Sequence, residues 1–120
     1  MLLFNTPEFK AMQKGLDMLW LKQKVISNNI ANAETPGYKA KSVSFANVMS
    51  SEYYKSNPDK IDELKPVITI NENSVRPDGN SVDLDTESLE LWRTYAQYAY
   101  LREKISGQFT NMRYVINNLG

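Results

Sequence analysis

Residues 27–39 read SNNIANAETPGYK, and this stretch decides where the first half of the chain turns. Three asparagines lie within five residues, and a Thr-Pro-Gly-Tyr turn follows almost at once. Asparagine is a weak helix former, because its side chain competes for nearby backbone groups. Pro36 disfavours helix at the residue before it, and Gly37 permits a left-handed backbone. The stretch therefore predicts the end of a helix, closed by a turn.

The residues before this turn carry a helical repeat. Pro7 suits the first position of a helix, and Glu8 suits the positive end of the helix dipole. Apolar residues then recur at alternating steps of three and four, which is typical of a helix that packs along another helix. We expect a helix over residues 7–33. Its contact seam comprises Phe9, Met12, Leu16, Leu19, Gln23, Ile26, Ile30 and Ala33.

The same repeat returns in the last third of the chain, after a possible helix cap at Asp83 or Asp85. The seam of this second helix comprises Leu84, Ser88, Leu91, Tyr95, Tyr98, Arg102, Ile105, Phe109, Met112, Ile116 and Leu119. Two such seams predict a mainly α fold, in which the N- and C-terminal helices pair as an antiparallel coiled-coil-like hairpin. If Phe9 lies near Leu119, the polar seam residues Gln23 and Arg102 share one level and are expected to hydrogen-bond.

The repeat vanishes between the two helices. We expect one structural domain with three parts: residues 1–37 with the first helix, an irregular middle at 38–82, and the last helix at 83–120. The middle carries at most a short helix, over residues 43–49, and a short strand, over residues 66–71, where apolar and polar residues alternate.

Several large apolar residues lie off both seams and need a third surface to cover them. They are Met18, Trp20, Leu21 and Val25 on the first helix, and Leu89, Trp92, Tyr100, Leu101 and Val115 on the last. Burying such side chains stabilises by about 1.5–3 kcal/mol each. The middle segment could fold back over them, but neighbouring copies of the chain would cover them better. We therefore expect the chain to be a subunit.

Composition limits the chemistry that the chain can perform. Among 120 residues there is no histidine and no cysteine, and 14 basic side chains balance 14 acidic ones. The sequence thus predicts no cofactor, no small-molecule substrate and no nucleic-acid partner. It also predicts no direct membrane insertion, since no apolar run approaches the ~20 residues that a membrane span needs. The first residues lack the features of a cleaved secretory signal.

Two motifs together resemble a known family. Asn-Asn-Ile-Ala-Asn followed by Thr-Pro-Gly-Tyr resembles the N-terminal signature of the bacterial flagellar rod, hook and hook-associated axial proteins. Its residues form the assembly motif: Asn28, Asn29, Ile30, Ala31, Asn32, Thr35, Pro36, Gly37 and Tyr38. Glu34 stands where Asn or Asp is commoner in that family. The second motif resembles the segment before the last helix of a proximal-rod member. It comprises Asp78, Gly79, Asn80, Val82, Asp83, Leu84 and Asp85.

Each motif also has a plain structural interpretation. The first would be a frayed helix end with a turn, and the second a turn with a helix cap. The resemblance adds that the asparagines hydrogen-bond across helix contacts or to the loop after Thr35, at an end that meets other chains. On the helix seams, the residues we expect to carry the pairing are Leu16, Leu19, Ile26, Ile30, Tyr95, Tyr98, Ile105, Phe109, Met112 and Ile116.

What the resemblance implies about function is a structural role without catalysis. The chain would be a subunit of the proximal rod of the flagellar basal body, assembling helically and transmitting torque. Its partners would be copies of itself, other rod proteins, the basal-body membrane ring and the export apparatus. It would reach the periplasmic space through the flagellar type III export route, without signal cleavage.

Two other classes stay open at this point. An autonomous helical hairpin could bind one partner, as a regulator or an export chaperone does. An enzyme could use carboxylates such as Asp83 and Asp85 with a metal, although helix capping explains both residues.

Overall fold

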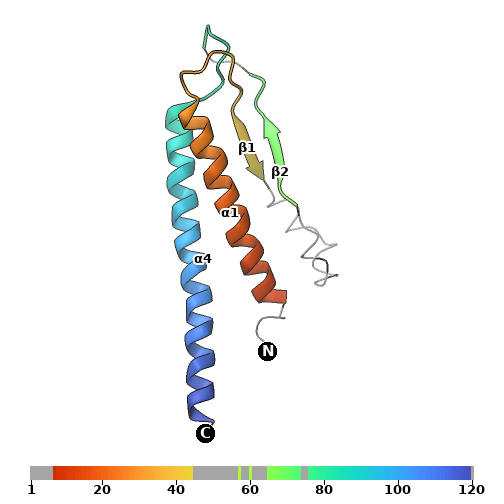
Figure 1. Ribbon diagram of the computed structural model, residues 1–120, viewed down its shortest axis with the longest axis vertical. Coiled ribbons are helices and arrows are strands. Elements are labelled where there is room, and N and C mark those ends of the chain that lie inside the picture. Colours follow the sequence, from red (N-terminus) through yellow and green to blue (C-terminus); the bar gives the residue numbers. More distant parts are fainter. Residues whose placement is uncertain (1–6, 45–56, 58–59, 61–64, 74–75, 120) are drawn as a thin grey trace.

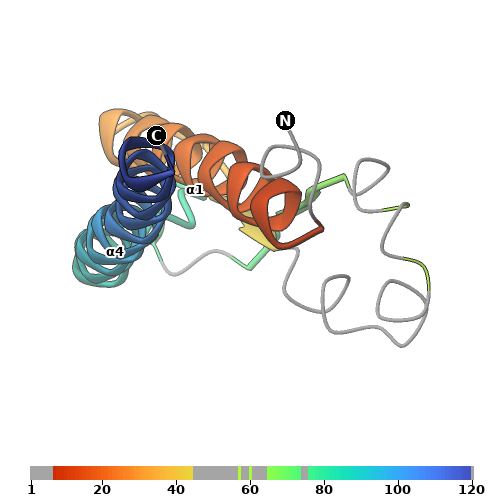
Figure 2. The ribbon, with the colours of Figure 1, turned by 90° about the horizontal axis from the view of Figure 1, so that it is seen from below.

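The computed structural model describes residues 7–44, 57, 60, 65–73 and 76–119. It contains, in chain order, helix α1 (Pro7–Ala31), strand β1 (Lys41–Ser44), strand β2 (Val67–Ile70) and helix α4 (Leu84–Asn118). Figure 1 shows α1 and α4 side by side as an antiparallel hairpin, with the two strands beside α1. The view from below also shows the two helices next to each other (Figure 2). The mainly helical fold predicted from the sequence is confirmed. Neither of the helices described is long and apolar enough to cross a membrane.

Local chemistry explains where α4 begins. Asp83 has an extended backbone, with φ of −107° and ψ of 108°, and its carboxylate accepts hydrogen bonds from the backbone N–H groups of Asp85 and Thr86. The Asp83 Oδ2 atom also accepts a bond of 3.1 Å from the Thr86 hydroxyl. These bonds satisfy N–H groups that a helix start leaves without partners. Of the two caps that the sequence allowed, the structure uses Asp83.

The register of the hairpin differs from the one we expected. Phe9 packs edge-to-face on Phe109, with ring centroids 5.9 Å apart, whereas the expected neighbour was Leu119. Further along, the Lys22 ammonium lies 3.3 Å from a carboxylate oxygen of Glu90. This register shifts α4 by almost three turns relative to the prediction.

The shift also corrects a predicted contact. Gln23 follows Lys22 directly and therefore lies near the level of Glu90, well over two turns from Arg102. Arg102 is exposed. The predicted hydrogen bond between Gln23 and Arg102 was wrong, because it assumed that the helices end together.

The described part of the middle contains two strands, where the sequence predicted one. β1 and β2 pair antiparallel, with Lys41 opposite Ile70 and Ser44 opposite Val67. The strand predicted over residues 66–71 is thus β2. The helical turns expected over residues 43–49 were wrong at Val43 and Ser44, which belong to β1, and residues 45–49 lie outside the described part. Val43 is buried, and β1 packs against α1.

The helices contact each other through a face that is rotated from the predicted seams. On α4 most of the least exposed residues recur with a heptad spacing, but one position away from part of the predicted set. They are Glu87, Leu91, Thr94, Tyr98, Leu101, Ile105, Gln108 and Met112, with Glu90 beside them. Tyr95 and Ile116 do not lie in the contact: their side chains are 49% and 61% exposed. Phe109 lies at its margin, against Phe9.

The same rotation occurs on α1. Phe9 and Ile26 are buried as the seam requires, but Leu16, Leu19 and Ile30 are only half-buried. Met18 and Val25, which the prediction left off the seam, are buried instead, at 4% and 9% exposure. The physical reason is that β1 covers one flank of α1, so the helix buries an arc that faces both the strand and α4.

Two glycines within the helices differ in what surrounds them, which gives a matched pair of predictions. A Cβ added at Gly107 would meet nothing within 4 Å, whereas one added at Gly15 would lie 2.8 Å from Leu101 Cδ2. We expect Gly107→Ala to raise the free energy of unfolding by about 1 kcal/mol, the helix-propensity difference. Gly15→Ala should raise the free energy of unfolding by less, or lower it, because α4 packs closely there. Urea unfolding followed by circular dichroism measures both, and equal gains would contradict the close packing.

Candidate functional site

The two sequence motifs come together at one end of the molecule, where α1 ends and α4 begins (Figure 1). We call this region the polar joint and define it as residues 28–41 and 76–87. Its two halves are held by hydrogen bonds between residues about 45 positions apart in the chain, such as the bond from Asn80 to Thr35. The structure therefore unites the assembly motif and the pre-helix motif into a single site.

Asn29 is the centre of one half of the joint, and its side chain is fully buried. Its Nδ2 donates to the Lys41 carbonyl at 2.7 Å and to Glu87 Oε2 at 3.0 Å. Its Oδ1 accepts from the Tyr38 hydroxyl at 3.1 Å and from the Lys41 backbone N–H at 3.0 Å. An amide side chain has two donor hydrogens and two acceptor lone pairs, so Asn29 uses its full capacity. It thereby ties α1 to β1 and to α4.

Asn80 is the centre of the other half and is also fully buried. Its Nδ2 lies within hydrogen-bond distance of three carbonyl oxygens in the turn that follows α1: Asn32 at 3.0 Å, Ala33 at 3.0 Å and Thr35 at 2.8 Å. Its Oδ1 accepts from the Val82 backbone N–H at 2.8 Å. A residue from the segment before α4 thus holds the turn that follows α1.

Two glycines allow the backbones of the two motifs to approach. Gly37 and Gly79 have positive φ angles, of 74° and 84°, which residues with a side chain rarely adopt. The Gly37 N–H donates to the Asp78 carbonyl at 3.0 Å, and the Ser81 N–H donates to the Tyr38 carbonyl at 3.0 Å. A Cβ at Gly79 would lie 3.5 Å from the Gly37 Cα. Both glycines are therefore required by conformation, and they face each other.

A small apolar cluster lies inside the joint. Ala33, Ala40 and Val82 are buried together, and Tyr38 packs against them. The Ala40 N–H donates to the Ser81 hydroxyl at 2.7 Å. Small side chains suit this position, because the two backbones are already close.

Other residues of the assembly motif lie at the surface of the joint. The Asn32 side chain donates to the Asn28 carbonyl at 2.8 Å and accepts from the Thr35 hydroxyl at 3.1 Å. Asn28, Ala31, Thr35 and Pro36 are exposed. The motif thus has an inward part, centred on Asn29, and an outward part that stays accessible.

The pre-helix motif divides in a similar way. Asp78 Oδ1 accepts from the Asn80 backbone N–H at 3.0 Å, which closes a tight turn. Asp83 caps α4, while Leu84 and Asp85 are exposed. Within the described ranges, no group of three or more acidic, histidine or cysteine residues is placed to hold a metal ion.

Sequence reasoning missed several residues of the joint. Lys41 and Glu87 complete the partners of Asn29, and Ser81 binds Ala40. The Arg76 guanidinium donates to the Ala33 carbonyl and lies 3.3 Å from the Glu34 carboxylate. The signal for Ser81 was its place inside the second motif. The other three are common surface residue types, and only the fold reveals their partners.

Glu87 has a perturbed acidity. Burial in the joint raises the pKa of its carboxyl group above the ordinary 4.5, the hydrogen bond from Asn29 opposes this, and the negative charges of Glu90 and Asp83 raise it further. Burial also raises the pKa of Tyr38, and the neighbouring Glu87 charge adds to that. The folded protein therefore holds a proton on Glu87 more tightly than the unfolded chain does.

This perturbation predicts a pH dependence of stability. A carboxyl whose pKa rises on folding stabilises the fold below its unfolded value, and that contribution is lost as the pH rises through the folded pKa. We expect this loss of stability to begin at about pH 4.5, the ordinary pKa of the carboxyl group. Glu87→Gln keeps an acceptor for Asn29 but cannot ionise. The variant should therefore gain stability relative to the unmodified protein as the pH rises through that window. Urea unfolding of both proteins from pH 4 to 7 measures it, and a constant difference would contradict the assignment.

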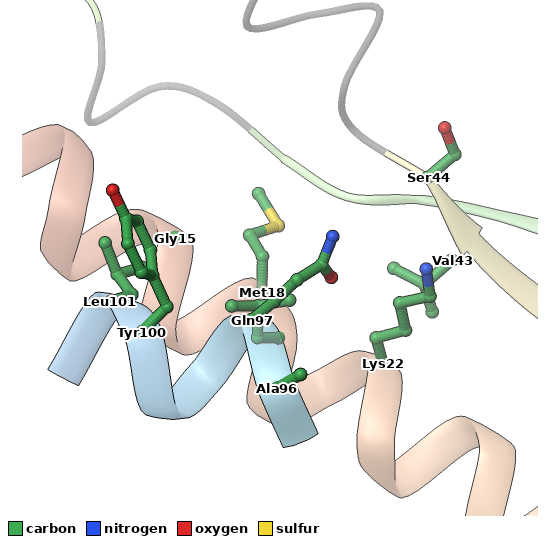
Figure 3. A pocket seen from close by; sticks show the side chains of 10 residues that line it. Gly15, Met18, Lys22, Val43, Ser44, Ala96, Gln97, Tyr100 and Leu101 are labelled. Carbon is green, nitrogen blue, oxygen red and sulfur yellow. The ribbon is translucent and has the colours of Figure 1, made fainter. Parts of the chain in front are cut away.

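An open groove lies further along the hairpin, between α1, α4 and β1. Its volume is about 580 Å³, and its lining includes Met18, Val43, Tyr100 and Leu101 (Figure 3). Lys22 also lines it, and this lysine is paired with Glu90. A mostly apolar groove of this kind suits packing rather than acid–base chemistry.

Comparisons with known proteins identify relatives of this chain. The sequence profile of a family described as "Flagella basal body rod protein" matches residues 13–39, which include the assembly motif. The chain is 34% identical over 115 residues to the flagellar basal body rod protein FlgB of Bacillus subtilis, covering 88% of this chain and 89% of that protein. It is 30% identical over 123 residues to FlgB of Buchnera aphidicola, covering 90% and 92%. With FlgB of Escherichia coli K12 it shares 26% identity over 125 residues, covering 88% and 90%.

Proposed function

Because the chain belongs to the FlgB family of flagellar basal body rod proteins, we propose that it is a structural subunit of the proximal rod. In this role it assembles helically with copies of itself and with other rod proteins, and it transmits torque without catalysing a reaction. The site described above supports this function, since its residues hold chain segments together.

The observation that carries the proposal is the exposed apolar surface of α4. Trp92, Tyr114 and Leu119 are 75%, 69% and 79% exposed, and Tyr100 is 62% exposed. Soluble monomers rarely expose apolar side chains along a whole helix, whereas subunit interfaces are rich in aromatic residues. Neighbouring subunits would cover these side chains in the rod.

The polar joint supports the mechanical part of the proposal. It fastens α1, β1 and α4 to one another at one end of the hairpin, through buried hydrogen bonds of Asn29 and Asn80. Two long helices that are fixed in this way cannot slide past each other without breaking those bonds. A subunit of this kind passes a twisting load on to its neighbours as a stiff body.

The outward part of the assembly motif has a proposed role of its own. Asn28 and Ala31 are exposed at the end of α1, so they are available to a neighbouring chain. In this proposal the outward residues of the motif make its contact with neighbouring rod subunits, while the inward residues hold the joint together. For location, the proposal is the basal body, in the periplasmic space near the membrane ring, reached through the flagellar export apparatus without signal cleavage.

The test is genetic and biochemical. Deleting the gene in its native host should abolish flagella and motility, and a tagged copy that restores motility should be recovered in purified basal bodies. A motile deletion strain, or a functional tagged copy absent from basal bodies, would refute the rod function.

A second measurement separates the rod subunit from an autonomous binding module such as a regulator or chaperone. Hydrogen exchange of the purified chain is followed from dilute to concentrated solution. A rod subunit should gain protection in α4 as the concentration rises, because its exposed apolar side chains become covered. Unchanged protection over the whole concentration range would favour the binding module.

A further inference from the structure

The exposed surface of the hairpin divides into two parts that differ in position and charge. Successive residues of a helix are rotated by about 100°. Thr94 of α4 is fully buried, so it marks the direction of the helix contact. Tyr95 is the next residue, and Arg102 and Ile116 repeat its position at intervals of seven. All three are exposed, and they form one flank of α4.

Residues of α1 continue this flank. Gly15 faces Leu101 of α4, so Leu16 lies about 100° round from the contact, in the same sense as Tyr95. Because the helices are antiparallel, equal forward rotations along each chain lead to the same side of the hairpin. The strand β1 lies over the other side, where Met18 and Val43 line the groove. We call the first side the heptad flank, and it comprises Leu16, Gln23 and Ile30 of α1 with Tyr95, Arg102, Arg113 and Ile116 of α4.

A second surface lies on the back of α4. Trp92 precedes Thr94 by two residues, so it is rotated by about 160° and points away from α1. Residues at similar rotations form what we call the outer stripe: Asp85, Leu89, Trp92, Glu103 and Tyr114. Leu89, Trp92 and Tyr114 are 53%, 75% and 69% exposed.

The two surfaces are complementary in charge. The charged residues of the heptad flank are Arg102 and Arg113, and those of the outer stripe are Asp85 and Glu103. Each surface combines these charges with large apolar side chains. A heptad repeat is the pattern of a helix that packs along another helix. At one end of the flank Phe9 and Phe109, which have the same repeat positions, pack on each other, whereas Tyr95, Arg102 and Ile116 stay exposed.

From this complementarity we propose that the heptad flank of one copy receives the outer stripe of α4 from a second copy. The contact joins two different surfaces, so each copy that binds leaves one surface of each kind free. Such a heterologous contact propagates into an open assembly, whereas a contact between identical patches stops at a dimer. The inference rests on the proposed function for its biological setting, but its physical test does not.

The experiment uses two variants of the full chain and follows association by sedimentation velocity over a concentration series. Trp92→Ala alters the stripe and Arg102→Glu alters the flank, and both side chains are exposed. Each variant alone should associate at least about tenfold more weakly than the unmodified chain, as expected for an aromatic anchor and a reversed charge. An equimolar mixture should form a 1:1 pair, since one variant keeps its flank and the other keeps its stripe.

Ile68→Ala is the control, because Ile68 is a 52% exposed apolar residue on β2 and belongs to neither helix surface. It should leave association unchanged, and circular dichroism should show native helix content in all three variants. A mixture that stays monomeric would overturn the proposal, and so would an unmodified chain that does not associate or a loss of association with Ile68→Ala alone. The deletion strain tests rod function separately, so a normal rod with no association through these surfaces would overturn only this inference.

Discussion

Replacing Asn29 by alanine should lower the free energy of unfolding by about 3 kcal/mol. Each buried polar group that loses its partner costs about 1–3 kcal/mol. The substitution removes one side chain that serves Lys41, Tyr38 and Glu87 at once. Alanine returns only part of this through its higher helix propensity, about 0.7 kcal/mol at most. Urea unfolding followed by circular dichroism gives the value directly.

The chain supplies a matched control for this prediction. Asn28 is the same residue type, one position earlier in the same helix, but exposed. Asn28→Ala should change stability by no more than about 0.5 kcal/mol, as for ordinary surface substitutions. Asn29→Asp is a second comparison. It should also destabilise near neutral pH, since a carboxylate cannot donate to Glu87 and places a like charge beside it. If Asn28→Ala and Asn29→Ala had equal effects, the joint would not depend on the buried amide.

Replacing Asn80 by alanine should cost a similar amount, about 3 kcal/mol, for a different reason. The lost amide removes a donor from the carbonyl groups of Asn32, Ala33 and Thr35 in the turn after α1, and it leaves the Val82 N–H without its acceptor. Hydrogen exchange should show where the loss acts. Protection should fall first in the turn after α1, although the substitution is almost 50 residues away in the chain.

An exposed asparagine in the middle segment is the control here. Asn73 lies in the described loop after β2 and is exposed, so Asn73→Ala should leave both stability and the exchange of the turn after α1 unchanged. Faster exchange confined to the start of α4 in the Asn80→Ala variant would contradict this role, because it would place the effect of Asn80 in its own turn alone.

The sequence predicts the helix termini well, because the signals at those points are local. Pro36 and Gly37 end α1 within a few residues, and Asp83 caps α4 through the next three residues. The two motifs also mark the residues of the joint. Their partnership with each other is not visible in the sequence, since Asn29 finds Glu87 and Asn80 finds Thr35 only after the chain has folded back.

The helix contact was harder to predict than the helices. Both helices carry apolar residues over a wide arc, and a heptad pattern selects the most regular stripe rather than the one that becomes buried. The face of α4 that contacts α1 includes Glu87 and Thr94. Because both are polar, a search for apolar repeats does not find them. The strand β1 was not predicted, for a related reason. Residues 41–44 have no strong strand pattern and are fixed by pairing with β2, more than 20 residues away.

The order in which the joint receives its parts constrains how the chain folds. A polypeptide that emerges into a compartment with its N-terminus leading presents α1 long before Asn80 and Glu87 arrive. Until then the turn after α1 lacks the Asn80 amide, and Asn29 lacks Glu87, one of its partners. Most of the stability of a helix in a protein comes from the packing of its apolar face, and α4 has not yet arrived. Folding therefore waits for the last third of the chain. A fragment that stops short of that point cannot complete the joint, so incomplete chains are left out of any structure that requires the finished hairpin.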